Sequence, residues 1–317
     1  MSMTPREAAI AALKGERPDA LVPHLELEFQ LAEELWGPEK RSLRNEHLEG
    51  VTGQKRQDML KRNADNWVEI AQRYKWNVIT GLHWLNLEDQ CRSFEYVKQT
   101  AGDTYMLSAF ADGTFSIPSG KNMVDHVIWL TENTQEALDS AERNAAAAID
   151  HAQTAIQAGA EVILMCADYC FNDGPFLSPT MFRQFVTPYL TKVVTGIHEA
   201  GGFAVKHTDG DIMPILDQLV ESGADAIHSL DPMAGIDIAH VRGLCGSRVC
   251  LIGNVNCALV QAGTKQQVQQ SAEYCLQHGG VDNGAYIYAT SNCIFTGVPI
   301  ENYEEMLRVR EELGYPK

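Results

Sequence analysis

The stretch that decides the fold is Phe203-Ala204-Val205-Lys206-His207-Thr208-Asp209-Gly210-Asp211. It begins as a short apolar strand over 203–205 and runs into polar, ionisable residues just before a helical pattern starts. In chains that alternate strands and helices, the loop after a strand's carboxyl end is where ligand sites are built. His207 and Asp209 stand two residues apart, so they point to the same side if the strand continues. An imidazole and a carboxylate on one side can bind a metal ion or form a hydrogen-bonded acid/base pair.

Strand-like and helical patterns alternate on both sides of this stretch. Apolar runs predict strands at residues 162–166, 226–229, 249–253 and 285–289. Helical patterns separate them, over about residues 135–157, 178–200, 211–222, 236–244, 264–278 and 301–313. Because this alternation indicates a parallel sheet, we predict an α/β fold, a single TIM-type (β/α)8 barrel domain over residues 1–317.

Polar or thiol residues follow five of these strands in succession. They are Asp168, His207 with Asp209, His228 with Asp231, Asn256 with Cys257, and Asn292 with Cys293. A β/α barrel gathers the carboxyl ends of its strands around one mouth. We therefore expect these side chains to meet at one site, although they are far apart in the sequence.

The first 75 residues are expected to form an N-terminal helix, a first strand and a charged helical region. Thr4-Pro5-Arg6-Glu7 is a capping box that opens a helix, which Gly15 ends. Residues 21–29 then alternate like a strand. The carboxylates of Glu26 and Glu28 in this strand either face a pocket or are solvated.

A β-ribbon insertion is predicted over residues 92–118. Phe94-Glu95-Tyr96-Val97 and Thr104-Tyr105-Met106-Leu107 read as two strands around Gly102-Asp103. A ribbon fits an insertion better than it fits a unit of the barrel. A further strand is expected before it, at 78–82.

Composition excludes several classes of partner. The 317 residues are 45% hydrophobic, which is enough for a large core. The 42 acidic residues outnumber 25 basic ones, and a formal charge of −17 argues against binding to nucleic acid. No run of 18 apolar residues predicts a membrane span, and the first residues lack a signal pattern, so a cytoplasmic protein is expected. Of eight dispersed cysteines, only Cys166 and Cys170 are close together.

His207, Cys257 and Cys293 are the candidate metal ligands, with Asp209 as a further one. Zinc takes about four ligands from Cys, His and carboxylate, and a catalytic site leaves one position open. These residues lack the compact spacing of a zinc finger, and only their places at strand ends bring them together. Buried thiols and a hydrogen-bonded histidine are the alternative interpretation.

Carboxylates and aromatic residues at the mouth are candidates for other roles. Asp168 and Asp209 can act as acids or bases, or orient a metal-bound histidine, and the same alternatives apply to His228 and Asp231. Trp84 and Phe171 each follow a presumed strand end and are candidates for contact with a planar ligand; packing in the core is the alternative.

Several motifs together resemble the uroporphyrinogen decarboxylase superfamily. They lie mainly between about residues 160 and 305: Ala167-Asp168, Gly174-Pro175-Phe176, Ser178-Pro179, Phe182, Pro188-Tyr189, His207-Thr208-Asp209-Gly210-Asp211, Gly223-Ala224-Asp225-Ala226, Gly253-Asn254-Val255, Gly263-Thr264, Gly279-Gly280 and Pro299-Ile300-Glu301-Asn302. The resemblance is looser over residues 1–60. It implies a distorted (β/α)8 barrel.

That superfamily contains decarboxylases and cobamide-dependent methyltransferases. The decarboxylases carry an Arg-Gln-Ala-Gly-Arg stretch that binds substrate carboxylates; here the corresponding strand has Glu26 and Glu28, which disfavours that activity. The methyltransferases bind zinc through a His-x-Cys pair and a distant cysteine. His207 matches this histidine and Cys293 the distant cysteine, whereas Asp209 departs from the pattern. The resemblance implies that Cys257 is able to supply the missing thiolate.

We therefore predict a zinc-dependent methyltransferase that works with a corrinoid protein, most simply by O-demethylation of a methoxylated aromatic. The zinc ligands would be His207, Cys257 and Cys293, with Asp168 and Asp209 catalytic. The substrate would contact the remaining candidates Glu28, Trp84, Phe171, His228 and Asp231. Alternatives are a methylcobamide:thiol methyltransferase of the coenzyme M type, a decarboxylase-like lyase, and a non-catalytic corrinoid-binding module. A homodimer is compatible with the sequence.

Overall fold

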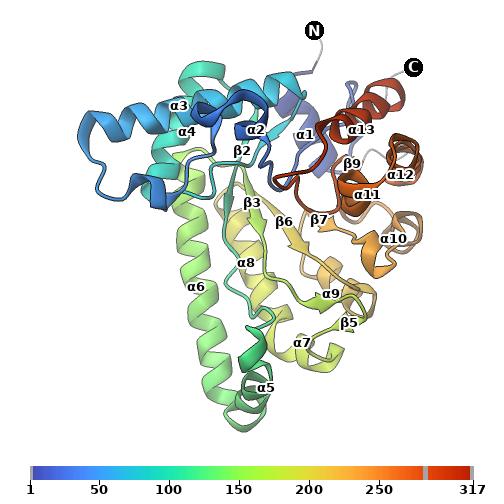
Figure 1. Ribbon diagram of the computed structural model, residues 1–317. Helices are drawn as coiled ribbons and strands as arrows, with labels where there is room; N and C mark the ends of the chain where they lie inside the picture. The colour runs from blue at the N-terminus through green and yellow to red at the C-terminus, as the bar shows by residue number, and fades with distance from the viewer. Residues whose placement is uncertain (1–2, 281–284, 315–317) are drawn as a thin grey trace.

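The computed structural model describes residues 3–280 and 285–314, which form a curled parallel sheet surrounded by helices (Figure 1). Seven strands are hydrogen-bonded neighbours in the order β1-β2-β3-β6-β7-β8-β9, and every pairing between them is parallel. These strands are β1 (Val78–Ile79), β2 (Met106–Phe110), β3 (Val162–Met165), β6 (Phe203–Thr208), β7 (Ala226–Ser229), β8 (Cys250–Ile252) and β9 (Tyr286–Ile287). A small antiparallel pair, β4 (Cys170–Phe171) with β5 (Gly174–Pro175), follows β3.

Residues 23–30 fill the place between the two ends of this sheet. His24 and Phe29 make isolated parallel bridges to Tyr288 and Ile294, on the β9 side. On the other side, the backbone N–H of Asn77 donates to the carbonyl of His24 at 2.8 Å. The first strand expected over 21–29 is therefore present as isolated bridges. With it, the barrel has eight strand positions, as predicted.

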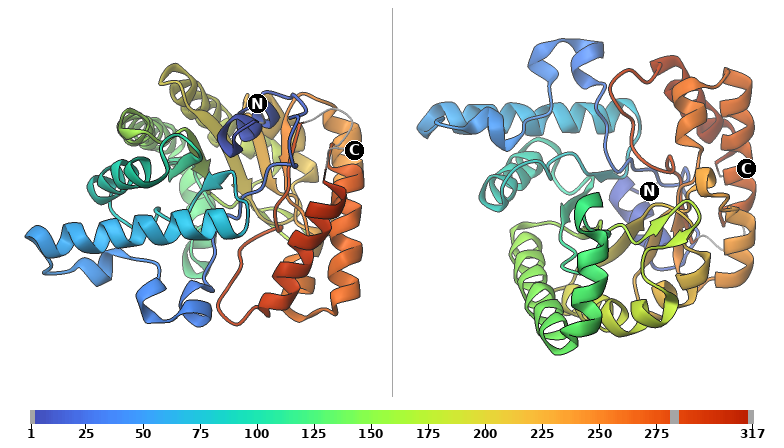
Figure 2. Two further views of the ribbon diagram at one scale, coloured as in Figure 1. Left: turned by 90° about the horizontal axis from the view of Figure 1, so that it is seen from above. Right: turned by 60° about the horizontal axis from the view of Figure 1, so that its bottom comes forward.

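Helices cover the outside of the barrel (Figures 1 and 2). Helix α3 packs on α4, α6 on α8, and α12 on α13. Helix α6 and the shorter α5 extend past the sheet at the end opposite the N-terminus, beside α7 (Figure 1). The helices are α1 (Pro5–Leu13), α2 (Ala32–Trp36), α3 (Gly53–Arg73), α4 (Leu87–Ala101), α5 (Met123–Glu132), α6 (Thr134–Ala158), α7 (Pro179–Phe185), α8 (Thr187–Glu199), α9 (Leu216–Glu221), α10 (Ile238–Cys245), α11 (Cys257–Ala262), α12 (Lys265–His278) and α13 (Ile300–Leu313), with 3-10 turns η1 (Pro38–Lys40), η2 (Asn45–Leu48), η3 (Gly120–Asn122), η4 (Met213–Ile215) and η5 (Pro232–Ala234). None of the helices in the described residues is both long and apolar enough to cross a bilayer.

The inside of the barrel is filled by alternate residues of its strands, together with the apolar face of α1. This buried cluster contains Ala9, Ala12, Leu13, Leu25, Leu27, Val78, Met106, Val162, Leu164, Val205, Ala226, Cys250, Ile252, Ile287, Ala289 and Cys293. Side chains of a strand repeat every two residues on one face. His207 follows Val205 by two and His228 follows Ala226 by two, so the alternation carries both imidazoles inward at the carboxyl end of the barrel.

The predicted β-ribbon over 92–118 is wrong. Its first half belongs to helix α4, which is capped by the side chain of Asn86 accepting from the N–H of Asp89. Phe94 and Val97 are buried on one face of that helix, because a spacing of three residues places them one turn apart. The second half is β2, a parallel strand of the barrel rather than a hairpin arm.

Candidate functional site

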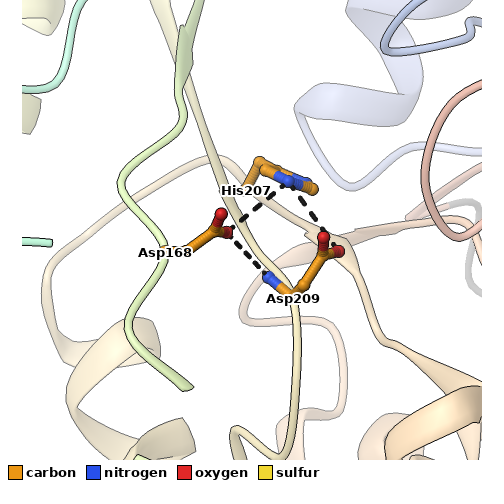
Figure 3. A group of neighbouring side chains, drawn as sticks. All are labelled: Asp168, His207 and Asp209. Atoms are coloured by element: carbon orange, nitrogen blue, oxygen red, sulfur yellow. Dashed lines mark hydrogen bonds and ion pairs between the residues drawn. The ribbon is translucent and has the colours of Figure 1, made fainter. Parts of the chain in front are cut away.

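Three side chains converge at the carboxyl ends of two neighbouring strands, β3 and β6 (Figure 3). The Nε2 atom of His207 lies 3.8 Å from Oδ1 of Asp168 and 3.8 Å from Oδ1 of Asp209. The backbone N–H of Asp209 donates to Asp168 Oδ1 at 3.1 Å. Within residues 3–280 and 285–314, this is the one group of three Cys, His or acidic residues whose potential ligand atoms all lie within 4.8 Å of one another.

The donor set and its spacing fit a divalent cation such as zinc. Zinc accepts imidazole nitrogen at about 2.0–2.1 Å and carboxylate oxygen at about 2.0–2.2 Å, so tetrahedral ligands stand roughly 3.5 Å apart. The observed 3.8 Å separations are close to that value. Three protein ligands leave one position open for substrate. The imidazole is buried, whereas the side chains of Asp168 and Asp209 are 50% and 31% exposed, so the site is open on the carboxylate side.

Asp209 is held in place by two hydrogen bonds. Its Oδ1 accepts from the Ser229 hydroxyl at 2.7 Å, and its Oδ2 accepts from the Asn292 amide at 2.6 Å. Burial raises the pKa of Asp209 to about 6, and the nearby carboxylates of Asp168 and Asp231 add to the rise. A cation at this point would offset the repulsion between these carboxylates.

Ser229 was not singled out by the sequence analysis, yet it links two strands to the site. Its hydroxyl also lies 2.6 Å from the carbonyl of Ser291. The backbone reaches this position through a positive φ of 84°, followed by 52° at Leu230. Such conformations cost on the order of 1–3 kcal/mol for residues other than glycine, and they concentrate at functional sites. No sequence signal marks this strain, because serine is an ordinary residue at a strand end.

The two predicted thiol ligands lie outside the group of three. Cys257 is the first residue of α11, and its backbone N–H donates to the Ser291 hydroxyl at 3.3 Å. Cys293 is 8% exposed in the barrel interior. Burial raises the pKa of both thiols; the charges of Glu28 and Glu26 add to the rise at Cys293, and that of Asp231 adds to the rise at Cys257. They do not form a close cluster with His207, and Asp168 and Asp209 take that place.

Two predicted substrate contacts, Glu28 and Trp84, are engaged with each other. Glu28 Oε1 accepts from the indole N–H of Trp84 at 3.0 Å and from the Gln30 amide at 2.9 Å. The guanidinium of Arg44 lies 3.9 Å from the centre of the Trp84 ring. One face of this indole is therefore covered. These four residues border the barrel mouth as a connected group.

The other three predicted contacts differ in exposure. Phe171 is 39% exposed and packs edge-to-face on Phe176, with ring centres 6.2 Å apart. Asp231 forms a hydrogen bond within its own loop, in which its Oδ1 accepts from the N–H of Met233. His228 is only 2% exposed and lies behind His207, so the structure does not support direct contact with a substrate.

Comparison with known proteins gives the family. Residues 75–313 match the model of the uroporphyrinogen decarboxylase (URO-D) family, which is more than two thirds of the chain. The chain belongs to the uroporphyrinogen decarboxylase family. Among solved structures, the URO-D family chain resembles a methyltransferase from Methanosarcina mazei, with a TM-score of 0.73, 18% identity, and coverage of 98% of this chain and 99% of that one. A B12-independent methionine synthase from Shewanella sp. W3-18-1 gives a TM-score of 0.53 at 13% identity, over 92% and 94% of the two chains. At such identities the likeness concerns the fold.

Curated relatives of this URO-D family chain have two kinds of activity. The uroporphyrinogen decarboxylase of Psychromonas ingrahamii is 28% identical over 178 residues, which are 53% of this chain and 46% of that one. The methylcobamide:CoM methyltransferase MtaA of Methanosarcina barkeri is 25% identical over 225 residues, which are 69% and 62% of the two chains. Both matches span less than two thirds of the relative. Family membership therefore indicates an enzyme without choosing between the two reactions.

Glu26 is a buried carboxyl group of this URO-D family chain, not the solvated strand carboxylate that the sequence also allowed. It is fully buried, its Oε2 accepts from the hydroxyl and the N–H of Thr290, and its Oε1 has no hydrogen-bond partner. Burial, opposed in part by the bonds from Thr290, raises the pKa of Glu26 to about 8. The carboxyl group therefore stays protonated in the folded protein at neutral pH.

Glu26→Gln is expected to remove a pH dependence of stability. The pKa of Glu26 rises from its ordinary 4.5 to about 8 on folding, so the folded state holds a proton that the unfolded state releases. The stabilisation is thus complete below pH 4.5 and is lost as pH rises through 8. Between about pH 5 and 7, the free energy of unfolding of the wild type should fall by roughly 3 kcal/mol relative to that of the Glu26→Gln variant, whose amide does not ionise. Chemical unfolding of both proteins across this pH range measures the difference. If the two free energies of unfolding change with pH in parallel, Glu26 ionises normally.

Proposed function

We propose that this chain is a zinc-dependent methyltransferase that moves a methyl group between a small substrate and the cobalt of a corrinoid protein. The observation that carries the proposal is the convergence of His207, Asp168 and Asp209 at the open end of the barrel. The likeness to MtaA, whose name describes methyl transfer from a cobamide, supports the reaction class. The barrel mouth is the face at which a corrinoid protein would dock.

Each side chain of the group has a distinct role in this proposal. His207 Nε2 and one oxygen each of Asp168 and Asp209 would hold zinc. Zinc bound there would supply Lewis acidity that favours departure of an oxygen or sulfur leaving group from the methyl carbon. Ser229 and Asn292 keep the Asp209 carboxylate oriented through its two hydrogen bonds. Asp168 is the more exposed of the two carboxylates, so the substrate would reach the site from its side.

A methoxylated aromatic is the substrate class that we favour. The close group contains nitrogen and oxygen donors, and such harder sites suit an oxygen substrate better than a thiol. Exposed Phe171, with Phe176 against it, offers an aromatic surface after β3, the strand that leads to Asp168. In the reaction, the methyl C–O bond breaks and the oxygen keeps the electron pair. Cobalt(I) supplies the pair for the new Co–C bond and becomes methyl-cobalt(III).

Decarboxylation is the second candidate, because decarboxylases are among the relatives. A substrate with several carboxylates would meet Asp168, Asp209 and Glu28 at this mouth, and like charges would repel it. The guanidinium of Arg44 lies 3.5 Å from Glu28, so its positive charge is already paired. Charge at the mouth therefore favours methyl transfer.

The direct test is incubation of the zinc-loaded protein with a Co(I) corrinoid protein and a panel of methoxyarenes, methylamines and methylated thiols. We expect a methoxyarene to convert the Co(I) absorbance to that of methyl-Co(III), with release of the phenol. Protein treated with a chelator should be inactive and should recover with zinc. Full activity without metal, or release of CO₂ from carboxylated substrates with no change at cobalt, would contradict the proposal.

A further inference from the structure

His207 and His228 form a pair of histidines deep in the barrel. They are direct neighbours in the register of β6 and β7, and their Nδ1 atoms lie 2.8 Å apart. The Nε2 atom of His228 lies 3.2 Å from the backbone carbonyl of Thr290. The two histidines are 5% and 2% exposed, so water does not compete for these contacts. Three groups thus form one chain of contacts that ends at the candidate metal site.

The acceptor at the far end of this chain fixes where the protons lie. A carbonyl oxygen only accepts, so His228 Nε2 must carry a hydrogen. The 2.8 Å contact between the two Nδ1 atoms needs one donor and one acceptor, and a doubly protonated ring has no acceptor, so the ring that accepts is neutral. His228 Nδ1 is then an acceptor, and His207 Nδ1 must be the donor across the 2.8 Å contact. His207 Nε2 is left with a lone pair.

The opposite arrangement of protons is less favourable at both ends of the chain. It would place the lone pair of His228 Nε2 against the Thr290 carbonyl at 3.2 Å, which is repulsive. It would also give His207 an Nε2–H group whose nearest carboxylate oxygens stand at 3.8 Å, beyond hydrogen-bonding distance. The arrangement with a free lone pair on His207 Nε2 therefore satisfies more of the buried groups.

We infer that His228 is a positioning residue that holds His207 in the Nδ1–H tautomer, so that its Nε2 lone pair faces Asp168 and Asp209 and is ready to bind a divalent cation. This role rests on the metal site of the proposed function, but it does not depend on which substrate is used. A metal-bound histidine commonly donates its other N–H to a partner, and loss of that partner typically weakens metal binding 10- to 100-fold. Here the partner is a second histidine, fixed in turn by a backbone carbonyl.

The tautomer can be measured in the wild-type protein without any substitution. In ¹⁵N-labelled, metal-free protein, nitrogen chemical shifts distinguish a protonated ring nitrogen from one with a lone pair. We expect His207 to show a protonated Nδ1 and an unprotonated Nε2, and His228 the reverse. Protonated Nε2 on His207 would overturn the inference whatever the metal affinity.

The variants His228→Leu and His228→Asn form a matched pair that tests how the acceptor on residue 228 affects zinc affinity. The two side chains have nearly the same shape, but only asparagine keeps an acceptor near the position of His228 Nδ1, and neither reaches the Thr290 carbonyl. We expect zinc affinity, measured by titration calorimetry, to fall 10- to 100-fold in the leucine variant and to recover largely in the asparagine variant. Circular dichroism and thermal unfolding confirm that both variants are folded.

Each result has one meaning for the inference. Equal zinc affinity in the wild type and in the two folded variants would overturn the role of His228 and leave the proposed metal site intact. Equal losses in both variants would show that packing, not the acceptor, matters. A wild-type protein that binds no zinc would overturn the metal site of the proposed function, and the role of His228 with it.

Discussion

Replacing His207 with alanine is expected to remove metal binding and methyl transfer together. His207 provides the one nitrogen of the three-residue group, and its removal leaves two carboxylates that repel each other without a buried ligand behind them. Loss of a supporting partner costs about 10- to 100-fold in affinity, so loss of a ligand should cost more, on the order of 1000-fold. Metal content after dialysis and the rate of methyl-Co(III) formation measure the two effects.

His198→Ala is the matched control for this experiment. His198 lies on helix α8, is 40% exposed in its side chain, and pairs with Asp225 at 2.8 Å, outside the site. It should retain zinc and full turnover. If His207→Ala also retains stoichiometric zinc and normal turnover, His207 is not a ligand. Retained zinc with lost turnover would instead assign His207 to the reaction and the metal to other residues.

The sequence predicted the strands and helices after residue 162 better than those before it. From residue 162 onward, strands and helices alternate with clear breaks, and the expected strands correspond to β3, β6, β7, β8 and β9. Before that point, Phe94, Tyr96 and Val97 resembled a strand because aromatic and β-branched residues favour strands. The structure places them in α4, where packing against α3 outweighs local preference. Residues 281–284, next to the last predicted strand, lie outside the described residues.

The sequence predicts where the candidate site lies, and the structure adds how close its side chains stand to one another. Strand ends correctly indicated that Asp168, His207 and Asp209 meet at one mouth. The pattern does not specify how far apart side chains stand around the barrel, and the close group contains no thiol. Cys257 begins a helix after β8, and Cys293 lies in the barrel interior, two strand positions or more from β6 in the sheet order.

Lys206 carried a signal that the sequence analysis did not use. A lysine between Val205 and His207 in a buried strand requires a charged partner, because lysine is almost never fully buried alone. The partner is Asp112, after β2, whose Oδ2 accepts from Lys206 Nζ at 2.6 Å. The sequence could indicate that a carboxylate was needed, but not which of 42 acidic residues would supply it.

This buried ion pair holds the segment that carries Asp168 in place. Lys206 is 0% exposed, and its Nζ also donates to the carbonyl of Ala167 at 2.9 Å and lies 4.0 Å from the centre of the Tyr169 ring. Asp112 Oδ2 accepts from the N–H of Ala167 at 2.9 Å. The pair therefore holds both backbone polar groups of Ala167, directly before Asp168, and Lys206 contacts the ring of Tyr169, directly after it. Burial acts to raise the pKa of Asp112, but the charge and hydrogen bond of Lys206 lower it overall.

Asp112→Ala is expected to lower the free energy of unfolding by about 3–5 kcal/mol, because it leaves the buried Lys206 ammonium without a countercharge. Lys206→Met should cost a similar amount through the unpaired Asp112 carboxylate. The double variant Asp112→Ala/Lys206→Met removes both charges, so it should lose less than the sum of the two single variants. Urea unfolding at neutral pH measures all three. Additive losses would mean that the two charges do not stabilise each other, and a loss below about 1 kcal/mol in Asp112→Ala would mean that water reaches Lys206 despite its burial.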